Sequence, residues 1–368
     1  MSETQKHTKP NVPNLRFPGF EGEWERKKIG SICSFFSGGT PSSSQKEYYG
    51  GVIPFIRSGE IHSDKTELFL TEKGYDNSSA KMVEKGDILL ALYGANSGDI
   101  SISQIQGAIN QAILCIRTDV TPSFFISVWE KHVQRVLNTY LQGGQGNLSA
   151  EIVKSIPLFI PSPREQEKLA GLFSLLDERI AVQSKVIECY KSLIRAIYEG
   201  FSISTNGIEC AIGDILSIGS GKDYKHLPEG NIPVYGTGGY MLSVDDWLYD
   251  GESVCIGRKG TIDHPFYIKG KFWTVDTLFY TYDFRGVIPK YCYYLFRTIN
   301  WQQYKEASGV PSLSKKTIEK IKVRIPSIDT QLKAVAVLDA VENSMTVGKQ
   351  TIHSYQKMKE YLLSQLII

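Results

Sequence analysis

Residues 156–168 read IPLFIPSPREQEK, and residues 321–333 read IKVRIPSIDTQLK. The two segments belong to one long repeat, which runs from Gly144 to Tyr198 and starts again at Gly309 with no insertion or deletion. Identical pairs are Gly144/Gly309, Leu148/Leu313, Ser149/Ser314, Ile156/Ile321, Ile160/Ile325, Pro161/Pro326, Ser162/Ser327, Gln166/Gln331, Lys168/Lys333, Val182/Val347, Ile187/Ile352 and Tyr190/Tyr355. Self-similarity over such a length indicates one structural unit used twice. The sequence therefore predicts two halves.

Each copy predicts a short apolar strand followed by the start of a helix. In the first copy Ser162 takes the N-cap position, Pro163 the first helical position, and Glu165 the position three residues after the cap. This is a capping box with a proline where the missing N–H costs nothing. The second copy has Thr330 in place of the glutamate. The N-terminus of the second helix should therefore be less stable than that of the first, by about 0.3–1 kcal/mol.

Both predicted helices carry apolar residues at alternating spacings of four and three, a seam of period 3.5. The seam residues are Leu169, Phe173, Leu176, Ile180, Ile187 and Tyr190 in the first helix and Leu338, Val341, Met345, Ile352, Tyr355 and Leu362 in the second. Gly200 marks the expected end of the first helix, so about 36 residues form a rod of roughly 54 Å. The simplest partner for each seam is the other copy. Packing of each helix on its own domain is the alternative.

The composition bounds the class of protein. With 42% hydrophobic residues among 368, the chain can form two or three packed domains. The net charge of +2 neither supports nor excludes nucleic-acid binding, since a nucleic-acid binder needs to be basic on one face only. The six cysteines lack a CxxC pair and nearby histidines, which indicates reduced thiols in a cytoplasmic protein. Because the N-terminal segment is polar and no apolar run approaches 18 residues, neither secretion nor a membrane span is expected.

The chain divides into five predicted segments. Residues 1–22 predict an N-terminal arm, 23–161 and 204–326 predict two mixed α/β domains, and 162–203 and 327–368 predict the two long helices. In the first domain, strands are expected at 53–56, 87–93 and 112–116 and a helix at 123–141. Short motifs return in the second domain: Ile29-Gly30-Ser31-Ile32 as Ile212-Gly213-Asp214-Ile215, Ile53-Pro54 as Ile232-Pro233, Lys85-Gly86-Asp87 as Asp250-Gly251-Glu252, and Ala108-Ile109-Asn110 as Thr274-Val275-Asp276.

Catalytic motifs are incomplete or missing. Residues 218–223 resemble a phosphate loop, but Asp223 stands where serine or threonine is required, so a turn is favoured. Residues 236–241 depart from GxGxxG because Met241 occupies the last position. No serine lies in GxSxG, the six histidines lack the spacing of a metal site, and the motifs of amino-methyltransferases and of Pro-Asp…Glu-x-Lys nucleases are absent. An enzyme that acts alone is therefore disfavoured.

Polar, glycine-rich loops with basic and aromatic side chains occur in both halves. Such loops suit DNA, because glycine lets the backbone approach, Arg, Lys, Asn and Gln bind base edges, and hydroxyl groups hold phosphates. Each loop taken alone is equally compatible with an ordinary turn. The candidate DNA-binding residues are Thr40, Arg57, Ser58, Tyr93, Asn96, Ser97, Gln111, Gln145 and Asn147 in the first half and Lys222, Tyr235, Thr237, Arg258, Lys259, Thr261 and Ser312 in the second.

Over essentially the whole chain, these features resemble the specificity subunit of a type I restriction-modification system. The resemblance is carried by Arg57-Ser58-Gly59-Glu60-Ile61, Gly107-Ala108-Ile109-Asn110-Gln111, Gln145-Gly146-Asn147-Leu148-Ser149, Pro161-Ser162-Pro163-Arg164-Glu165-Gln166, Ile256-Gly257-Arg258-Lys259-Gly260-Thr261-Ile262 and Phe272-Trp273-Thr274-Val275-Asp276-Thr277. The opening Pro13-Asn14-Leu15-Arg16-Phe17-Pro18-Gly19-Phe20 also resembles the usual start of the family. The segment Ile328-Asp329-Thr330-Gln331 departs from the family's Pro-x-x-Glu-Gln.

The resemblance implies an α+β fold. Two tandem mixed α/β target-recognition domains would stand in a pseudo-twofold arrangement, separated by two long helices that pair as an antiparallel coiled coil. The chain would be a non-catalytic subunit whose domains each grip one half of a bipartite site on double-stranded DNA, while the helices fix the gap. Two modification subunits would use S-adenosylmethionine to methylate adenine N6, and restriction subunits would use ATP and Mg²⁺. No cofactor, metal or membrane is expected on this chain.

Two other classes of function stay open from the residues. One is a duplicated β-rich module that binds protein or glycan, with the helices as a dimerisation rod; glycan affinity without DNA affinity would favour it. The other is an enzyme with a cryptic active site, which methyl transfer by the purified chain alone would support. The bases read are not predictable, because recognition depends on loop geometry and DNA shape as well as on side-chain identity.

Overall fold

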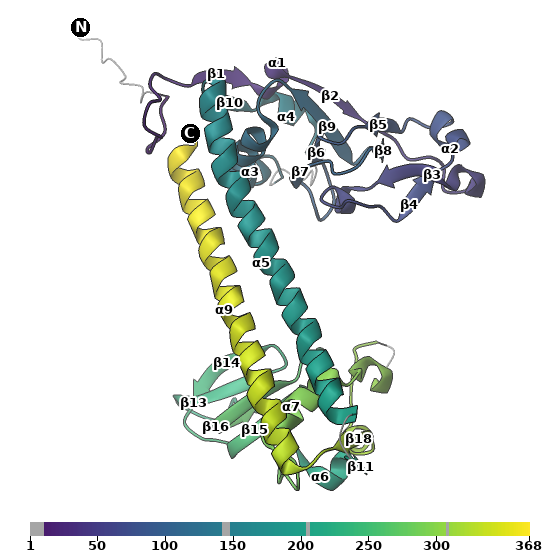
Figure 1. The fold of residues 1–368 in the computed structure, drawn as a ribbon, viewed down its shortest axis with the longest axis vertical. Coiled ribbons are helices and arrows are strands. Elements are labelled where there is room, and N and C mark those ends of the chain that lie inside the picture. Colours follow the sequence, from purple (N-terminus) through teal and green to yellow (C-terminus); the bar gives the residue numbers. More distant parts are fainter. Residues whose placement is uncertain (1–10, 142–147, 204–206, 307–308) are drawn as a thin grey trace. The chain divides into compact units, whose positions relative to one another are not determined.

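The computed structural model describes residues 11–141, 148–203, 207–306 and 309–368, without the side chains of residues 140–141 and 202–203. The chain divides into two compact units. The first unit comprises residues 1–182 and 352–368, and the second comprises residues 183–351. The division falls inside the two long helices, α5 (Pro163–Ile203) and α9 (Ile328–Leu366), which are teal and yellow in Figure 1. Each unit therefore contains one end of both helices.

The first unit contains two four-stranded sheets and a two-stranded ribbon (Figure 1). The ribbon pairs β1 (Glu25–Lys28) with β10 (Pro157–Ile160). One sheet has the order β2 (Cys33–Ser37), β9 (Ile113–Thr118), β6 (Ile88–Ala91), β7 (Ile100–Ile102). The other has the order β4 (Leu68–Leu70), β3 (Tyr49–Ile56), β8 (Gly107–Ile109), β5 (Lys81–Val83), with β3 and β8 parallel. The helices are α1 (Ile29–Ile32), η1 (Lys46–Tyr48), η2 (Ser58–Glu60), α2 (Glu72–Asp76), α3 (Pro122–Leu141) and α4 (Ala150–Ser155).

Strand β6 lies at the centre of this unit because both of its faces are apolar. Ile88 and Leu90 pack in the cluster that contains Phe124 and Val128 of α3. Leu89 and Ala91 pack on the other side, with residues of β3, β5 and β8. A strand covered on both faces reads as a continuous apolar run rather than as alternation. The strands expected at 53–56, 87–93 and 112–116 and the helix expected at 123–141 are confirmed as β3, β6, β9 and α3.

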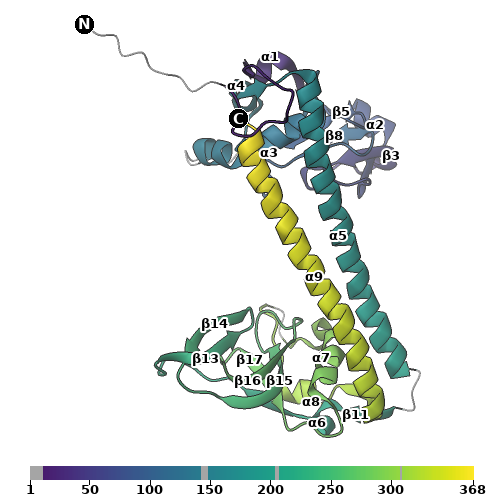
Figure 2. The same ribbon diagram turned by 60° about the vertical axis from the view of Figure 1, so that its left-hand side comes forward.

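The second unit repeats this plan with longer strands. A ribbon pairs β11 (Ile208–Ala211) with β18 (Lys322–Ile325). A six-stranded sheet has the order β12 (Ser217–Ser220), β17 (Leu278–Tyr282), β15 (Tyr249–Gly257), β16 (Phe266–Thr274), β13 (Glu229–Gly236), β14 (Gly239–Val244). Figure 2 shows this sheet beside α7 (Pro289–Thr298). The other helices are α6 (Ile212–Ile215), η3 (Trp301–Tyr304) and α8 (Lys315–Glu319).

The two units share individual contacts as well as a strand plan. The space beside Gly30 in α1 is filled by Lys154 of α4, and the space beside Gly213 in α6 is filled by Glu319 of α8. In both units the parallel pair joins corresponding strands, β3 with β8 and β13 with β16. Strands β15 and β16 are long and continuous, whereas the first unit has short strands, β5 to β8, in their place. The two four-stranded sheets of the first unit therefore correspond to the single six-stranded sheet of the second. The predicted fold class, α+β with two tandem mixed α/β domains and two long helices, is confirmed.

Within each unit the ends of α5 and α9 pack antiparallel. In the first unit Leu169 and Phe173 share a core with Leu363 and Leu366. In the second unit a Cβ on Gly348 would lie 2.7 Å from Nε2 of Gln183 and 3.3 Å from the Ile187 side chain, so side chains of α5 pack directly on α9 at this glycine. Leu169, Phe173, Leu176, Ile187, Leu338 and Met345 of the predicted seam are buried, and Ile180, Tyr190, Val341, Ile352, Tyr355 and Leu362 are half-buried.

The expected helix stop at Gly200 is wrong, because α5 continues to Ile203. The end of α5 is held by buried Ile194 and Tyr198, and the Tyr198 ring lies 5.5 Å from the ring of Tyr291 in α7. This packing outweighs the weak helix propensity of one glycine, about 1 kcal/mol. Among the residues that the structure describes, no helix combines the length and the apolar character of a membrane span.

The N-terminal arm is tied to the start of α5. The Arg16 guanidinium donates to both carboxylate oxygens of Glu165, at 2.8 and 2.7 Å, and the glutamate side chain is only 2% exposed. The carboxylate expected in a capping box thus anchors the arm. In the second copy the Ser327 hydroxyl accepts from the N–H of Thr330 at 3.4 Å and contacts its hydroxyl at 3.0 Å. Thr330 therefore contributes to the cap of α9 through its own hydroxyl.

Candidate nucleic-acid interface

In the second unit the loops that follow four strands meet at one edge of the sheet. The N–H of Lys222, after β12, donates to the carbonyl of Thr274 at the end of β16. The N–H of Val275 donates to the carbonyl of Tyr235 at the end of β13. The N–H of Arg258, after β15, donates to the carbonyl of Thr277. These bonds bring most of the predicted residues of the second half to one place.

Two glycines allow the close approach of these loops. A Cβ on Gly221 would lie 1.9 Å from the carbonyl oxygen of Val275, and a Cβ on Gly257 would lie 2.0 Å from that of Thr261. The Gly257 site is also bordered by the methyl group of Thr237, at 3.3 Å, from the turn between β13 and β14. No other residue fits these two positions without moving backbone.

The edge carries cations and hydroxyl groups. Arg258 and Lys259 are exposed, and Lys259 forms a β-bridge with Ser312. These side chains border an open groove of about 360 Å³, which is also lined by Ser220, Ser314 and Lys315 and by one carboxylate, Glu306. Phosphate oxygens are bound by such guanidinium, ammonium and hydroxyl groups. Lys222 and Thr261 are exposed on the same loops.

The first unit gathers its loops in the same way. The N–H of Gly38 donates to the carbonyl of Asn110, and the Thr40 hydroxyl donates to Oε1 of Gln111 at 2.6 Å. The N–H of Leu148 donates to the carbonyl of Leu92, as the N–H of Leu313 donates to that of Arg258 in the second unit. Asn96 is exposed, and its amide nitrogen borders Gly59. Thr40, Asn96 and Gln111 are thus exposed at one edge.

Arg57 is bound by carboxylates of its own unit. Its guanidinium donates to Glu60 at 3.1 and 3.0 Å and to Glu67 at 2.6 Å. Partial burial opposes ionisation of Glu60, but the bonds from Arg57 and from backbone N–H groups outweigh it and lower the pKa of Glu60 to about 2. The same ion pairs raise the pKa of Arg57. Arg57 therefore fixes the loop between β3 and β4, and neighbouring Ser58 is half-buried in η2.

Three further predicted residues have structural contacts. Tyr93 packs against the core of the first unit, and burial raises its pKa. The Ser97 hydroxyl donates to the carbonyl of Leu92 at 2.9 Å. Tyr235 is half-buried between the rings of Tyr240 and Phe266, and burial raises its pKa. Gln145 and Asn147 lie outside the described residues.

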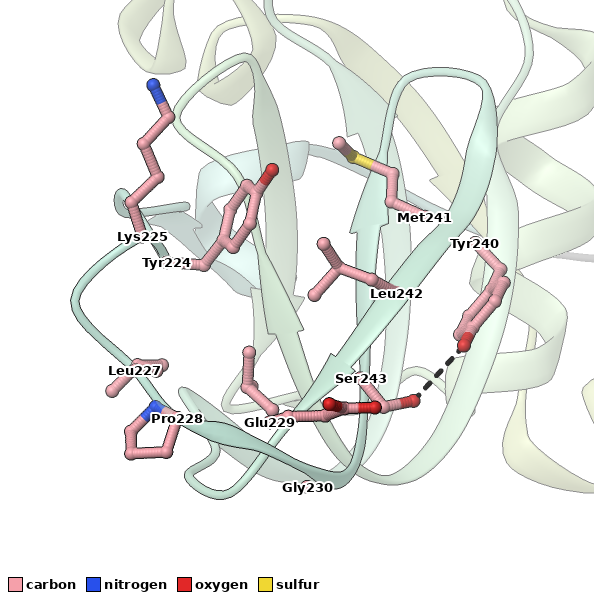
Figure 3. A pocket seen from close by; sticks show the side chains of 11 residues that line it. Tyr224, Lys225, Leu227, Pro228, Glu229, Gly230, Tyr240, Met241, Leu242 and Ser243 are labelled. Atoms are coloured by element: carbon pink, nitrogen blue, oxygen red, sulfur yellow. Dashed lines mark hydrogen bonds between the residues drawn. The ribbon is translucent and has the colours of Figure 1, made fainter.

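The β13–β14 hairpin carries two exposed side chains that are not among the predicted DNA-binding residues. Tyr240 is 63% exposed and Met241 is 49% exposed. Both border an open groove of about 790 Å³, whose other side is formed by Tyr224 and Lys225 (Figure 3). The sequence signal was a two-residue turn with glycine between apolar runs, which is typical of a hairpin. Exposure of its apolar residues could not be deduced from that pattern.

Neither a metal centre nor a reactive thiol stands out in the described residues. No three histidine, cysteine, aspartate or glutamate side chains gather there closely enough to hold a metal ion. All six cysteines are free thiols. Burial raises the pKa of Cys115 to about 12, and burial also raises the pKa values of Cys255 and Cys292. What the edges offer chemically is hydrogen bonding, charge and apolar contact.

Comparison with known proteins gives consistent matches. A model of the type I restriction modification DNA specificity domain matches residues 21–188 and again residues 209–354. The specificity subunit of type I restriction enzyme MjaIX from Methanocaldococcus jannaschii is 27% identical over 194 residues, which cover 49% of this chain and 44% of that protein. The EcoprrI specificity subunit from Escherichia coli is 22% identical over 376 residues, which cover 89% of this chain and 90% of that protein. The crystal structure of the S subunit of the type I restriction-modification system from M. genitalium shares the fold, with a TM-score of 0.65 at 18% identity over 97% of this chain and 99% of that one.

Proposed function

The chain belongs to the family of type I restriction-modification DNA specificity proteins, non-catalytic recognition subunits, through two copies of their domain, and we propose that each unit reads one half of a bipartite DNA site. The first unit would read through the loop edge that contains Thr40, Asn96 and Gln111. The second would hold its half-site at the edge that contains Lys222, Arg258 and Lys259, whose cationic groups would contact phosphates beside the bases that are read. The remaining predicted residues at each edge would position these side chains or contact phosphates.

One observation carries this proposal: the two units use the same backbone bonds to gather different side chains. The carbonyls of Leu92 and Arg258 accept from the N–H groups of Leu148 and Leu313 at equivalent places, yet the Leu92 side chain is buried in the core, whereas the Arg258 side chain is exposed and cationic. The scaffold is thus kept while the groups offered to a ligand change. Two different half-sites on one duplex need two such readers, because base edges in the major groove are distinguished by donor and acceptor pattern.

The long helices would set the number of unread base pairs between the half-sites. A helix rises 1.5 Å per residue, so its length is a fixed quantity that the loops do not alter. Domain separation must match the groove phase along the duplex if both domains are to bind. The repeat keeps its length in the helices and varies it in the domains. This contrast supports a spacer role.

Exposed apolar residues recur at equivalent helix positions and support docking of two identical partners. Val182 and Val347 are one such pair, and Leu193 and Met358 are another. A repeated apolar surface suits two copies of one subunit, and exposed apolar groups mark interaction sites. The partners would be two modification subunits, which bind S-adenosylmethionine, together with restriction subunits that use ATP and Mg²⁺. The assembly would act in the cytoplasm.

The test is co-expression with the neighbouring modification subunit, followed by mapping of N6-methyladenine on host DNA. The expected result is a single split motif with a fixed gap. Methylation at an unsplit motif, or a stable complex that leaves the DNA unmethylated, would contradict the proposal. A purified chain that binds glycan or protein but no DNA would instead support the interaction-module alternative.

A further inference from the structure

The two-stranded ribbon of β13 and β14 forms one end of the six-stranded sheet of the second unit, in which β13 also pairs with β16 at Val234 and Tyr235. Strand β14 pairs with β13, and the two are joined by a turn at Thr237 and Gly238. Gly239, which directly follows these two residues, has a positive φ of 102°, a conformation that glycine adopts readily. A two-stranded ribbon of this kind fits the major groove of B-form DNA.

Met241 lies where this ribbon meets the loop edge. A Cβ on Gly236 would be 2.8 Å from the Met241 sulfur and 3.6 Å from a methyl group of Val275. Val275 belongs to the loop whose neighbours bind Lys222 and Arg258, so the methionine adjoins the cationic loops. A duplex held by those loops would therefore also meet the Met241 side chain.

Tyr240 holds the neighbouring position on the ribbon. Its hydroxyl lies 3.2 Å from the Ser243 hydroxyl, and its ring meets that of Tyr235 edge-on at 6.4 Å. Figure 3 shows Tyr240 and Met241 on one side of the groove and Tyr224 on the other, with Leu242 between them. Lys225 and one carboxylate, Glu229, line the groove, and Lys222 is exposed three residues before Lys225 on the same loop. The ribbon thus presents apolar groups beside cations.

We propose that Met241, supported by Tyr240, reads the methyl group of a thymine in the half-site bound by the second unit; this inference rests on the proposed DNA recognition. In the major groove the thymine C5-methyl is the apolar feature that distinguishes one base from the others. The flexible thioether of methionine adapts to such a contact. Lys222 and Lys225 attract the phosphates on either side without regard to sequence.

The first unit has no equivalent of this hairpin among its described residues. There the β3–β4 connection spans residues 57–67 and is folded around the ion pairs of Arg57, Glu60 and Glu67. In the second unit the equivalent strands are joined by the two-residue turn. The methyl contact is therefore expected in one half-site only.

The experiment uses the full-length chain in complex with its modification subunits and duplexes that carry the mapped split target. Each thymine is replaced in turn by deoxyuridine, which removes the methyl group and keeps the pairing. The wild-type complex should bind the duplex with deoxyuridine at one position of one half-site about fourfold more weakly than the unmodified duplex. This factor corresponds to the free energy of burying one methyl group. The Met241→Ala complex should lose this distinction between thymine and uracil, whereas Met241→Leu should keep it.

Ile208→Ala is the matched control, because Ile208 is an apolar residue of the same unit that is 75% exposed on β11, in a different sheet. This variant should keep the thymine-to-uracil ratio. An unchanged ratio in Met241→Ala, or a target in which no thymine methyl matters, would overturn the inference and leave the proposed function intact. A wild-type complex without preference for any split target would overturn both.

Discussion

Gln166 and Gln331 make the same pair of hydrogen bonds in the two units. Nε2 of Gln166 donates to the carbonyl of Pro161 at 3.0 Å, and its Oε1 accepts from the N–H of Thr121, just before α3, at 3.1 Å. Nε2 of Gln331 donates to the carbonyl of Pro326 at 2.9 Å, and its Oε1 accepts from the N–H of Ile288, just before α7, at 2.8 Å. Both side chains are buried. Each long helix is thus joined at its start to the helix of its own domain.

Replacement of either glutamine by leucine should destabilise its unit. Leucine has nearly the same volume but leaves a buried carbonyl and a buried N–H unpaired, so Gln166→Leu and Gln331→Leu should each lower the free energy of unfolding by about 1–3 kcal/mol. Urea denaturation followed by circular dichroism measures the change. Gln356→Leu, on an exposed face of α9, is the control. Equal stability of Gln331→Leu and the control would contradict the anchoring role.

The ion pair of Arg57 and Glu60 should make stability depend on pH. The pKa of Glu60 is lowered to about 2 in the folded chain from an ordinary 4.5. A lowered pKa stabilises the fold above about pH 4.5, and that stabilisation is lost as the pH falls toward 2. Because Arg57 is partly exposed, Glu60→Gln should cost only about 1 kcal/mol at pH 7.

Unfolding of Glu60→Gln and wild type is compared at pH 7 and at pH 3, where the difference between them should shrink. Glu67→Gln is the control, since it removes a more exposed carboxylate from the same arginine and should cost less at pH 7. A Glu60→Gln difference that stays constant between the two pH values would show that the ionised carboxylate is not the stabilising group.

The cationic loops of the second unit should supply affinity without sequence preference. Arg258→Ala and Lys259→Ala should each weaken DNA binding and reduce the slope of log affinity against log salt by about 0.9, the value for one phosphate contact. Titrations at several salt concentrations on specific and random duplexes measure both quantities. Lys349→Ala, an exposed lysine of α9, should leave the slope unchanged. If all three substitutions changed the slope of log affinity against log salt by the same amount, Arg258 and Lys259 would not be the specific phosphate contacts.

Thiol reactivity should follow burial. Cys189 is exposed on α5, whereas Cys115, Cys255 and Cys292 are buried and their pKa values are raised by that burial. Because the thiolate is the reactive form, brief alkylation at pH 8 followed by mass spectrometry should label Cys189 first. Labelling of Cys255 at the same rate in the folded chain would contradict the packing of β15.

The elements that the sequence predicted best are those whose pattern is local. The period of 3.5 from Leu169 onward and the Ser162-Pro163 start predicted α5, and the apolar run of 87–93 predicted β6. The features that the sequence did not predict depend on contacts between residues that are far apart along the chain. Gly200 failed as a helix stop because Tyr198 packs on Tyr291, and Glu165 is bound by Arg16, 149 residues away.

The candidate site was predictable as a set of loops, and less so as single residues. Backbone bonds such as that from Leu313 to Arg258 gather the loops, and the repeat already related them. Arg57 was predicted from the sequence to bind DNA, but the carboxylates that bind its guanidinium are apparent only in the folded structure. Exposure of Tyr240 and Met241 likewise depends on β14 being the last strand of its sheet.

The central claim is that the units read separate half-sites while the helices fix the gap. The most direct measurement is the methylation map of a variant that lacks the equivalent segments 184–187 and 349–352. Four residues correspond to about 6 Å of helix, close to two base pairs of DNA. Both half-site sequences should stay as in wild type, and the gap between them should shorten. An unchanged gap, or half-sites with a different sequence, would contradict the account.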